Sequence, residues 1–342
     1  MIDAEFIAVP ANRQIIAELS ARAPANPFAT ASFFESRRRV GCSTWVLGLR
    51  DNAGALECGC GAFLRRGRLD RTLVISSLPA VGADSSFWSG LRDFCAQHAV
   101  TKLELGTFGS PPGVEIPRLS NHGTSRSRSE FVLGLAADLA TMLSANHRRN
   151  VKRAQQAGLV VWRTQTAEGL SVHQALMTDS IDRRRRRGEN IPGIRPSPEH
   201  VALLESGAGE LYQALRAGTV LSSALVLLGP KGGYHQSAGT SPDGMAVGAS
   251  HFLIHSIALQ LSAEGAQIFN LGGADEGSGL ARFKEGFGAS RVPLPSANFY
   301  LGAPWRRWAS RGIASIRADR EKLLRLLIAR MSHLTVPKQG KE

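Results

Sequence analysis

Clusters of arginine are the chemically most distinctive feature of this 342-residue sequence. The formal net charge is +13, from 41 basic and 28 acidic residues, and 34 of the basic residues are Arg. Arg148 with Lys152, and Arg149 with Arg153, are four residues apart, and residues 183–187 are five consecutive arginines. Guanidinium groups bind phosphates and carboxylates through paired hydrogen bonds. These clusters therefore predict an anion-binding surface, with a merely solvated basic face as the alternative.

Several other kinds of chemistry are not supported by the sequence. It contains no Ser-His-Asp signature, no Walker loop and no metal-ligand constellation, so we expect no metal. The four cysteines, at positions 42, 58, 60 and 95, do not have zinc-site spacing and are expected to be reduced. Three Tyr and five Trp are not interleaved with the basic runs, which disfavours a dedicated nucleic-acid binder.

The amino-terminal residues and the apolar runs bear on localisation. Residues 1–12 contain Asp3 and Glu5 and lack the cationic and apolar regions of a signal peptide. No apolar run approaches the roughly 18–20 residues that are needed to span a bilayer. We therefore expect a cytoplasmic protein that is either soluble or peripheral at the inner face of the membrane.

The elements that must position any site follow one another in a mixed α/β order. Strands are predicted at residues 44–50, 55–64, 73–78, 102–105, 131–135, 159–163, 210–216, 220–228, 232–238, 267–271 and 292–301. Helices are predicted at residues 85–98, 146–157, 168–187, 198–206, 250–264 and 280–286, with another helical stretch that begins at Asp138. Consecutive strands in the second half disfavour a strictly doubly wound fold.

The segment at residues 106–129 has no hydrophobic periodicity and is rich in Gly, Pro and Ser, so it is interpreted as a linker or a long connection between the two halves. This interpretation gives a first domain at residues 1–115 and a second at residues 130–303. Residues 304–342 hold ten basic and three acidic side chains, with apolar residues at helical spacing. They predict a basic amphipathic helical tail, which either packs on its own domain or lies on an anionic membrane surface.

Two stretches of the second half carry a family resemblance. One is LSANHRRNVKRAQQAG at residues 143–158. The other runs from GYHQSAG at residues 233–239, through NLGG at 270–273, to LARFKEGFG at 280–288. Together they resemble the Fem-type and related GNAT-like acyltransferases, often grouped as FemAB-like, over roughly residues 130–301.

The resemblance implies two GNAT-like domains in tandem, each with a mixed central sheet, and an N-acyltransferase activity. The donor would be acyl-CoA or another activated, phosphate-bearing molecule, and the acceptor an amine of an envelope component or a small molecule. A first alternative is the reaction of the Fem enzymes proper, which transfer an aminoacyl group from charged tRNA for peptidoglycan biosynthesis. A second alternative is a non-catalytic scaffold at the membrane surface.

The resemblance also implies roles for residues near its end. Lys284 matches the lysine that follows Phe in the family motif and is associated there with polarising the transferred carbonyl. A cation at that oxygen stabilises the oxyanion of acyl transfer. The alternative is a surface lysine paired with Glu285 or Asp275. From its own chemistry, His235 is the candidate general base, since its ordinary pKa lies near neutrality, and a hydrogen-bonded structural histidine is the alternative. Asp275 is a further candidate catalytic carboxylate, with a cap of the following helix as the alternative.

The helix that begins near Ser250 is where a GNAT fold would hold the CoA pyrophosphate. Gly248, Ala249 and Ser250 are the candidate cofactor-binding residues, because the start of a helix offers free N–H groups to an anion. The usual R/Q-x-x-G-x-G/A pattern is missing here, which leaves room for another donor. A plain turn with a helix cap is the alternative.

Substrate contacts are expected from the neighbouring strand and from the cationic helix. Strand alternation places Tyr234 and Gln236 on one face and His235 on the other. The candidate substrate-binding residues are Tyr234, Gln236, Arg149, Arg153 and Phe283.

Overall fold

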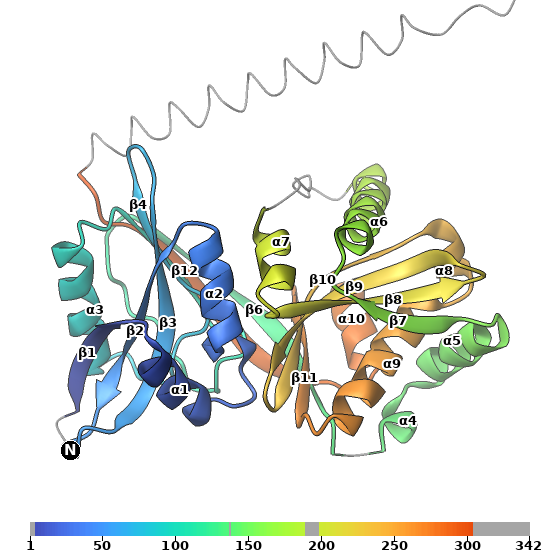
Figure 1. Cartoon of the computed structure of the whole chain (residues 1–342), viewed down its shortest axis with the longest axis horizontal. Coiled ribbons are helices and arrows are strands. Elements are labelled where there is room, and N and C mark those ends of the chain that lie inside the picture. Colours follow the sequence, from blue (N-terminus) through green and yellow to red (C-terminus); the bar gives the residue numbers. More distant parts are fainter. Residues whose placement is uncertain (1–3, 137, 189–197, 304–342) are drawn as a thin grey trace, which may run out of the picture.

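The chain forms two lobes that lie side by side (Figure 1). The computed structural model describes residues 4–136, 138–188 and 198–303. The predicted basic tail at residues 304–342 lies outside them.

The first lobe is built from the amino-terminal third of the chain. Its elements are β1 (Glu5–Pro10), α1 (Arg13–Arg22), the 3-10 helix η1 (Pro27–Ala29), α2 (Ala31–Arg39), β2 (Ser43–Arg50), β3 (Leu56–Arg66), β4 (Arg71–Ile75), α3 (Ser86–Gln97) and β5 (Lys102–Gly106).

The second lobe follows, and its last strand returns to the junction of the lobes. Its elements are β6 (Gly123–Gly134), α4 (Leu139–Met142), α5 (Ala145–Gln156), β7 (Val160–Thr164), α6 (Ala167–Arg186), α7 (Pro198–Glu205), β8 (Gly209–Arg216), β9 (Thr219–Gly229), β10 (Gly232–Thr240), α8 (Pro242–Ala246), α9 (Ala249–Ala263), β11 (Ile268–Ala274), α10 (Gly279–Glu285) and β12 (Ser290–Tyr300).

One mixed sheet of twelve described strands runs through both lobes, in the order β1-β2-β3-β4-β5-β12-β6-β11-β10-β9-β8-β7. The pairs β4–β5 and β10–β11 are parallel, and the other described neighbours are antiparallel. Helix α3 connects the first parallel pair and α9 the second. The orders β1-β2-β3-β4-β5-β12 and β7-β8-β9-β10-β11-β6 therefore repeat one topology, as the tandem GNAT-like prediction requires.

Strands β6 and β12 join the lobes (Figure 1). Residues Ser290 to Phe299 of β12 pair with β6, and its residues Ser296 to Tyr300 pair with β5. The last described strand, β12, thus completes the sheet of the first lobe. Residues of β12 belong to the second predicted domain but pair with β5 of the first. The domain boundaries at residues 115 and 130 therefore stay a prediction.

The sequence pattern was wrong about part of the predicted linker. Residues from Gly123 onward belong to β6, and their partners are in β12. The first five residues of β6 are exposed and mostly polar, so they show no apolar alternation. Strand pairing across the lobe junction, rather than burial of side chains, fixes their extended conformation.

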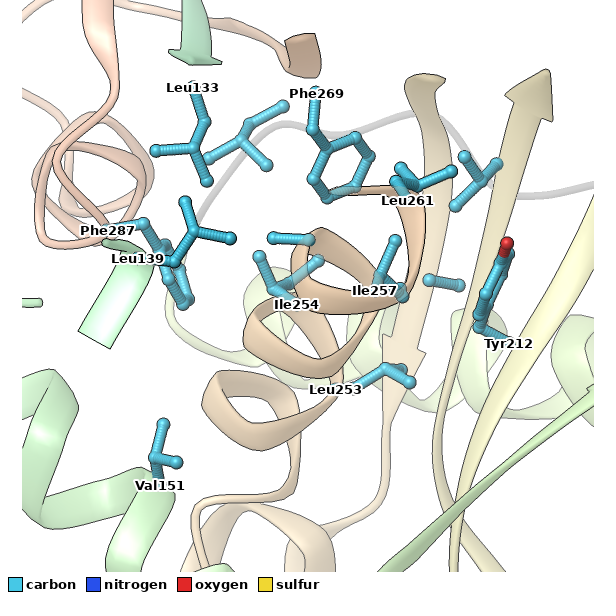
Figure 2. Close-up of a cluster of buried hydrophobic side chains, with 14 of the residues drawn as sticks. Leu133, Leu139, Val151, Tyr212, Leu253, Ile254, Ile257, Leu261, Phe269 and Phe287 are labelled. Carbon is cyan, nitrogen blue, oxygen red and sulfur yellow. The ribbon is translucent and has the colours of Figure 1, made fainter. Parts of the chain in front are cut away.

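The core of the second lobe surrounds α9 (Figure 2). Leu253, Ile254, Ile257 and Leu261 project from this helix, and Phe269 of β11 lies beside them. Each such side chain, once fully buried, contributes about 1.5–3 kcal/mol. The apolar run that predicted α9 is therefore explained by a helix that is packed on several sides.

A third cluster of buried residues connects the two lobes. Phe28 and Phe33 of the first lobe belong to the same cluster as Leu203, Leu227 and Tyr234 of the second. Helices α2 and α7 pack against each other across this junction. The lobes therefore hold a fixed relationship through apolar contacts as well as through β6 and β12.

Candidate active site

A cavity of about 900 Å³ lies at the junction of the two lobes. The second lobe contributes the strand residues Tyr234, His235 and Gln236, and the α10 residues Phe283 and Lys284. The first lobe contributes an aromatic wall and several polar side chains, namely Phe28, Phe33, Phe63, Phe108, Arg37, Arg65, Cys42, Ser76 and Glu104. Such a cavity has the size expected of a small-molecule site.

The cavity extends into an opening between β10 and β11. These parallel strands pair only from Gly232 to Tyr234, opposite Ile268 to Asn270. A β-bulge follows on β10 between His235 and Ser237, where its register with β9 shifts. The bulge bends β10 away from β11. It also replaces the simple alternation that we predicted, so Tyr234, His235 and Gln236 all line the cavity.

Gly272 keeps this opening clear on the β11 side. Its φ of +75° is unfavourable for residues with a side chain. A Cβ atom there would lie 3.5 Å from the Tyr234 hydroxyl and 3.7 Å from Nζ of Lys284. The same contacts show that the tyrosine hydroxyl and the lysine ammonium both approach Gly272.

Lys284 projects inward rather than into solvent. Ser278 caps the short helix α10, and Lys284 is 6% exposed although it lines the cavity. Its Nζ donates a hydrogen bond to the Gly273 carbonyl at 3.0 Å and lies 5.8 Å from the centre of the Phe131 ring. Burial lowers the pKa of Lys284 to about 8. The side chain is therefore still mostly protonated at neutral pH and can act as a localised cation.

Glu130 is a buried carboxylate that sequence reasoning missed. It is 2% exposed, and its Oε2 accepts a hydrogen bond from the Gly109 N–H at 3.0 Å. Among the described residues, its Oε1 has no hydrogen-bond partner. Burial raises its pKa, while Asn270, Gly109, Tyr234 and Lys284 act in the opposite direction. The site thus combines a buried carboxylate with a buried ammonium.

His235 has the right position for a general base but an unsuitable pKa. Burial, together with the neighbouring Lys284 and His173, lowers its pKa to about 3. Its Nε2 is buried without a hydrogen-bond partner in the described part of the chain. An imidazole with this pKa stays neutral at physiological pH and is a weak proton acceptor, which disfavours the general-base role.

The two motif stretches that carried the family resemblance pack against each other. The His147 Nε2–H donates to the Phe283 carbonyl at 2.8 Å, and its Nδ1 accepts from the Ser144 hydroxyl at 2.9 Å. The Ser144 N–H also donates to the Gly286 carbonyl. A Cβ on Gly286 would lie 2.1 Å from the His147 ring. Helix α5 therefore holds α10, and with it Lys284, in place.

Asp275 does not lie in the cavity as expected. It follows the last residue of β11, its side chain is 62% exposed, and it forms an ion pair with Arg126 at 2.8 Å. The chain turns outward at this point, toward the exposed start of β6. Lys284 likewise does not pair with Glu285, because that carboxylate is in an ion pair with Arg291.

The start of α9 contributes less to the cavity than predicted. Ser250 lines it, but Gly248 and Ala249 are buried and absent from its lining. Gly248, the residue that caps α9, has a φ of +78° and packs against Asn150 of α5. In addition, the connection from β10 is occupied by α8. An anion site at the start of α9 therefore stays a prediction, with Ser250 as its member in the cavity lining.

Arg149 and Arg153 lie on the exposed face of α5, outside the cavity lining. One Arg153 guanidinium nitrogen donates to the Ala246 carbonyl at the end of α8, at 3.3 Å. This places a cation beside the start of α9. Within the described residues, neither arginine has a carboxylate within ion-pair distance.

Cysteine and metal chemistry find no support in the described residues. Cys42 lines the cavity, but burial raises its pKa, so it is not an activated thiolate. The four cysteines are unpaired. No group of three or more His, Cys, Asp or Glu side chains that could hold a metal occurs in the described chain. Nor does that part of the chain contain a helix both long and apolar enough to cross a membrane.

Comparison with known proteins agrees with this geometry. Residues 143–285 match the acetyltransferase (GNAT) domain family. The fold is similar to that of FemX, with a TM-score of 0.63 and 14% identity over 88% of this chain and 99% of that chain. The sequence has no significant match among curated proteins.

Two further solved structures share the fold. A tandem GNAT protein from the clavulanic acid biosynthesis pathway gives a TM-score of 0.50 and 13% identity, over 87% of this chain and 99% of that one. L-PGS from Bacillus licheniformis gives a TM-score of 0.50 and 11% identity, over 85% of this chain and 92% of that chain. The domain match confirms the resemblance to GNAT acyltransferases and the prediction of a transferase, and the solved structures share the fold of the chain.

Proposed function

We propose, for a chain that carries a GNAT acetyltransferase domain within a tandem GNAT-like fold, that the cavity between the lobes transfers an acyl group to an amine. The observation that carries this proposal is the position of Lys284. Its ammonium is buried, lines the cavity and lies beside the opening between β10 and β11. A buried cation of this kind stabilises negative charge that develops on a carbonyl oxygen.

In the proposed reaction, one carbon–nitrogen bond forms and one bond from carbon to the leaving group breaks. The unprotonated amine of the acceptor attacks the acyl carbonyl, and a carbon–nitrogen bond forms while the carbonyl oxygen becomes an oxyanion beside Lys284. The intermediate collapses when the bond from carbon to the donor's sulfur or oxygen breaks. The amine loses one proton and the leaving group gains one, so the products are an amide and a free thiol or hydroxyl.

The two ends of the cavity would hold different substrates. The opening between β10 and β11, with Ser250 of α9 beside it, is the place for the activated acyl group. The aromatic wall of the first lobe, with Arg37 and Arg65 beyond it, is the place for the acceptor. Lys284 lies on the second-lobe side, where the two substrates would meet.

Acyl-CoA is the donor that we favour, since a GNAT fold houses the reaction. Its phosphates would be bound by Arg149 and Arg153 on α5, because Gly248 packs against Asn150 at the start of α9. Aminoacyl-tRNA is the second candidate, and the exposed cationic face of α5 favours it, because a polyanion requires an open basic surface.

Calorimetric titration with acetyl-CoA and, separately, with charged tRNA distinguishes the two donors. Transfer is then measured by mass spectrometry of envelope amines and small metabolites after incubation with the donor. Lys284→Met is the inactive control, and Lys231→Met, a change at an exposed lysine, is its matched partner. Acylation of no amine by the wild-type protein with either donor would overturn the proposal.

A non-catalytic scaffold is the weaker interpretation. A scaffold places no demand on Lys284, whose charge would be better solvated at the surface. Burial of an ammonium without a carboxylate in contact costs stability. Functional sites are where such costs are commonly retained.

A further inference from the structure

Glu130 lies where the two lobes meet and is used by neither substrate in the mechanism above. It belongs to β6, between β12 and β11 in the sheet, and it does not line the cavity. A carboxylate that is only 2% exposed is costly to bury, even with the Gly109 N–H donating to it and the Asn270 and Tyr234 side chains beside it. An apolar residue at this position would stabilise the core more, so the buried carboxylate indicates a role in the site.

One oxygen of Glu130 fixes the wall of the first lobe. Its Oε2 accepts the hydrogen bond from the N–H of Gly109, which has a φ of +63°. The preceding residue, Phe108, lines the cavity, and its ring lies 6.2 Å from the ring of Tyr234. The carboxylate therefore holds the loop that carries part of the aromatic wall.

The charge of Glu130 acts on the second lobe. Glu130 is paired with Gly273 of β11, whose carbonyl accepts the hydrogen bond from Nζ of Lys284, so the carboxylate lies close to the ammonium. The charge of the carboxylate raises the pKa of Lys284, while burial, the larger effect, and Arg128 lower it. Tyr234 and His235 of β10 are the other titratable groups close to this pair. On α10 itself, Glu285 is in an ion pair with Arg291, and Arg282 donates to the Gly277 carbonyl, so neither compensates Lys284.

We propose that Glu130 is a positioning residue, whose carboxylate holds the Phe108–Gly109 wall of the first lobe and faces the ammonium of Lys284 across the β6–β11 pair. This inference rests on the proposed role of Lys284 as the cation at the oxyanion. The Glu130 carboxylate then connects the Phe108–Gly109 wall, on the acceptor side of the cavity, with the Lys284 ammonium on the donor side. Its loss would leave a buried lysine beside Arg128 with no opposing charge.

The test measures the titration of Lys284 directly and requires no substrate. Trace labelling of the intact protein with an amine-reactive anhydride, between about pH 5 and pH 10, followed by peptide mass spectrometry, gives the pKa of Lys284. We expect Glu130→Gln to lower that pKa by about one pH unit from its value near 8, which is a tenfold loss of the protonated form at alkaline pH. Glu104→Gln, which removes an exposed carboxylate from the same cavity, is the control and should leave it unchanged.

A second measurement covers the case in which Glu130→Gln does not fold. Coupling between two sites is reciprocal, so Lys284→Met should raise the pKa of the Glu130 carboxyl group, followed by carbon-13 NMR. Hydrogen exchange at Gly109 should be faster in Glu130→Ala than in Glu130→Gln, which keeps an acceptor oxygen.

These outcomes separate the inference from the proposed function. An unchanged Lys284 titration in folded Glu130→Gln, or an unchanged Glu130 titration in Lys284→Met, would overturn the positioning role even if the protein transfers acyl groups. A shifted titration in a protein that acylates no amine would support the coupling and overturn only its use in catalysis.

Discussion

The two lobes share one strand order, but only one of their parallel strand pairs opens. In the first lobe, β4 and β5 pair from Thr72 to Ile75, and the bridge between Ser77 and Thr107 holds the chains together beyond that point. In the second lobe, β10 and β11 separate after Tyr234 and Asn270. A β-bulge on β10 and a left-handed glycine on β11 accompany the separation.

The difference shows where the candidate site comes from. Topology alone would give each lobe a site at its parallel pair. In the first lobe, however, the bridge between Ser77 and Thr107 keeps the chains together, and α3 packs mainly against β1 and β2. In the second lobe, local irregularities open the pair and Lys284 lines the resulting space. The first lobe contributes a wall of the cavity, and the second contributes Lys284, the residue that would act in the reaction.

The largest effect is expected from Lys284→Met, which keeps the apolar stem and removes the charge. Turnover should fall by about 10²–10³, the usual cost of losing one oxyanion-stabilising donor. Unfolding should be little changed, because the cost of burying an ammonium disappears together with its hydrogen bond. The measurement is the rate of amide formation, with Lys231→Met as control. Equal rates in the two variants would mean that the opening between β10 and β11 is not the reacting site.

The contact between the two motifs is the next feature to test. Gly286→Ala should destabilise the second lobe by about 1–3 kcal/mol, because the new methyl group overlaps the His147 ring. Gly279→Ala in the same helix meets no atom within 4 Å and is the control. Both are measured by chemical unfolding. If His147→Ala does not remove most of the cost of Gly286→Ala, the clash is not its cause.

The pH dependence of turnover follows from the pKa of Lys284. The protonated form is the active one, so activity contributed by this cation is present below about pH 8 and is lost above it. At alkaline pH we expect turnover to fall about tenfold per pH unit. Measurements of kcat across this range, with an acceptor amine that remains unprotonated throughout, test the expectation. A flat alkaline profile would contradict it.

Gly272→Ala changes a left-handed glycine in the open strand pair, and Gly54→Ala changes one in a turn of the first lobe. We expect Gly272→Ala to lose about 1–2 kcal/mol of stability through its left-handed backbone. We also expect activity to fall up to about tenfold, because the new methyl group would lie 3.1 Å from the His235 carbonyl and shift the strand beside Tyr234. Gly54→Ala, at a φ of +78° with no neighbour within 4 Å, should show the strain without the loss of activity. Loss of activity in both variants would point to strain rather than to the opening.

The smallest effect is expected on α5. Arg149→Ala combined with Arg153→Ala should weaken donor binding several-fold, since both positions are exposed, and added salt should reduce the difference. Calorimetry with acetyl-CoA and with charged tRNA measures this. Binding that is insensitive to both changes favours a solvated basic face.

Most of the second lobe could be predicted because its elements bury a regular apolar pattern. The nearly continuous buried runs of β8 and β9 and the apolar run at α9 are examples. The elements before β2 were not predicted. Helix α1 has only three buried residues in ten, and η1 packs through contacts to the other lobe that a local pattern does not reveal.

The site could be predicted only in part. Lys284 came from a motif, and Tyr234 from its neighbours on the same strand. Glu130 was missed because an isolated glutamate in a polar stretch looks like a surface residue, and only the pairing of β6 with β11 and β12 buries it. Asp275 was misplaced because the direction of the chain after β11 is not encoded in its spacing from Gly273. The hydrophobic periodicity of the sequence likewise predicts neither the β-bulge on β10 nor the contacts between the lobes.

Protection of Lys284 by a bound donor shows whether the acyl group occupies the opening between β10 and β11. The intact protein is labelled at lysine with and without saturating acetyl-CoA or charged tRNA, and labelling at Lys284 is compared with that at Lys231 by mass spectrometry. We predict that at least one donor lowers labelling of Lys284 about tenfold and leaves Lys231 unchanged, because the acyl group would occupy the opening beside Gly272. Equal labelling of Lys284 with and without a donor that calorimetry shows to be bound would contradict the account.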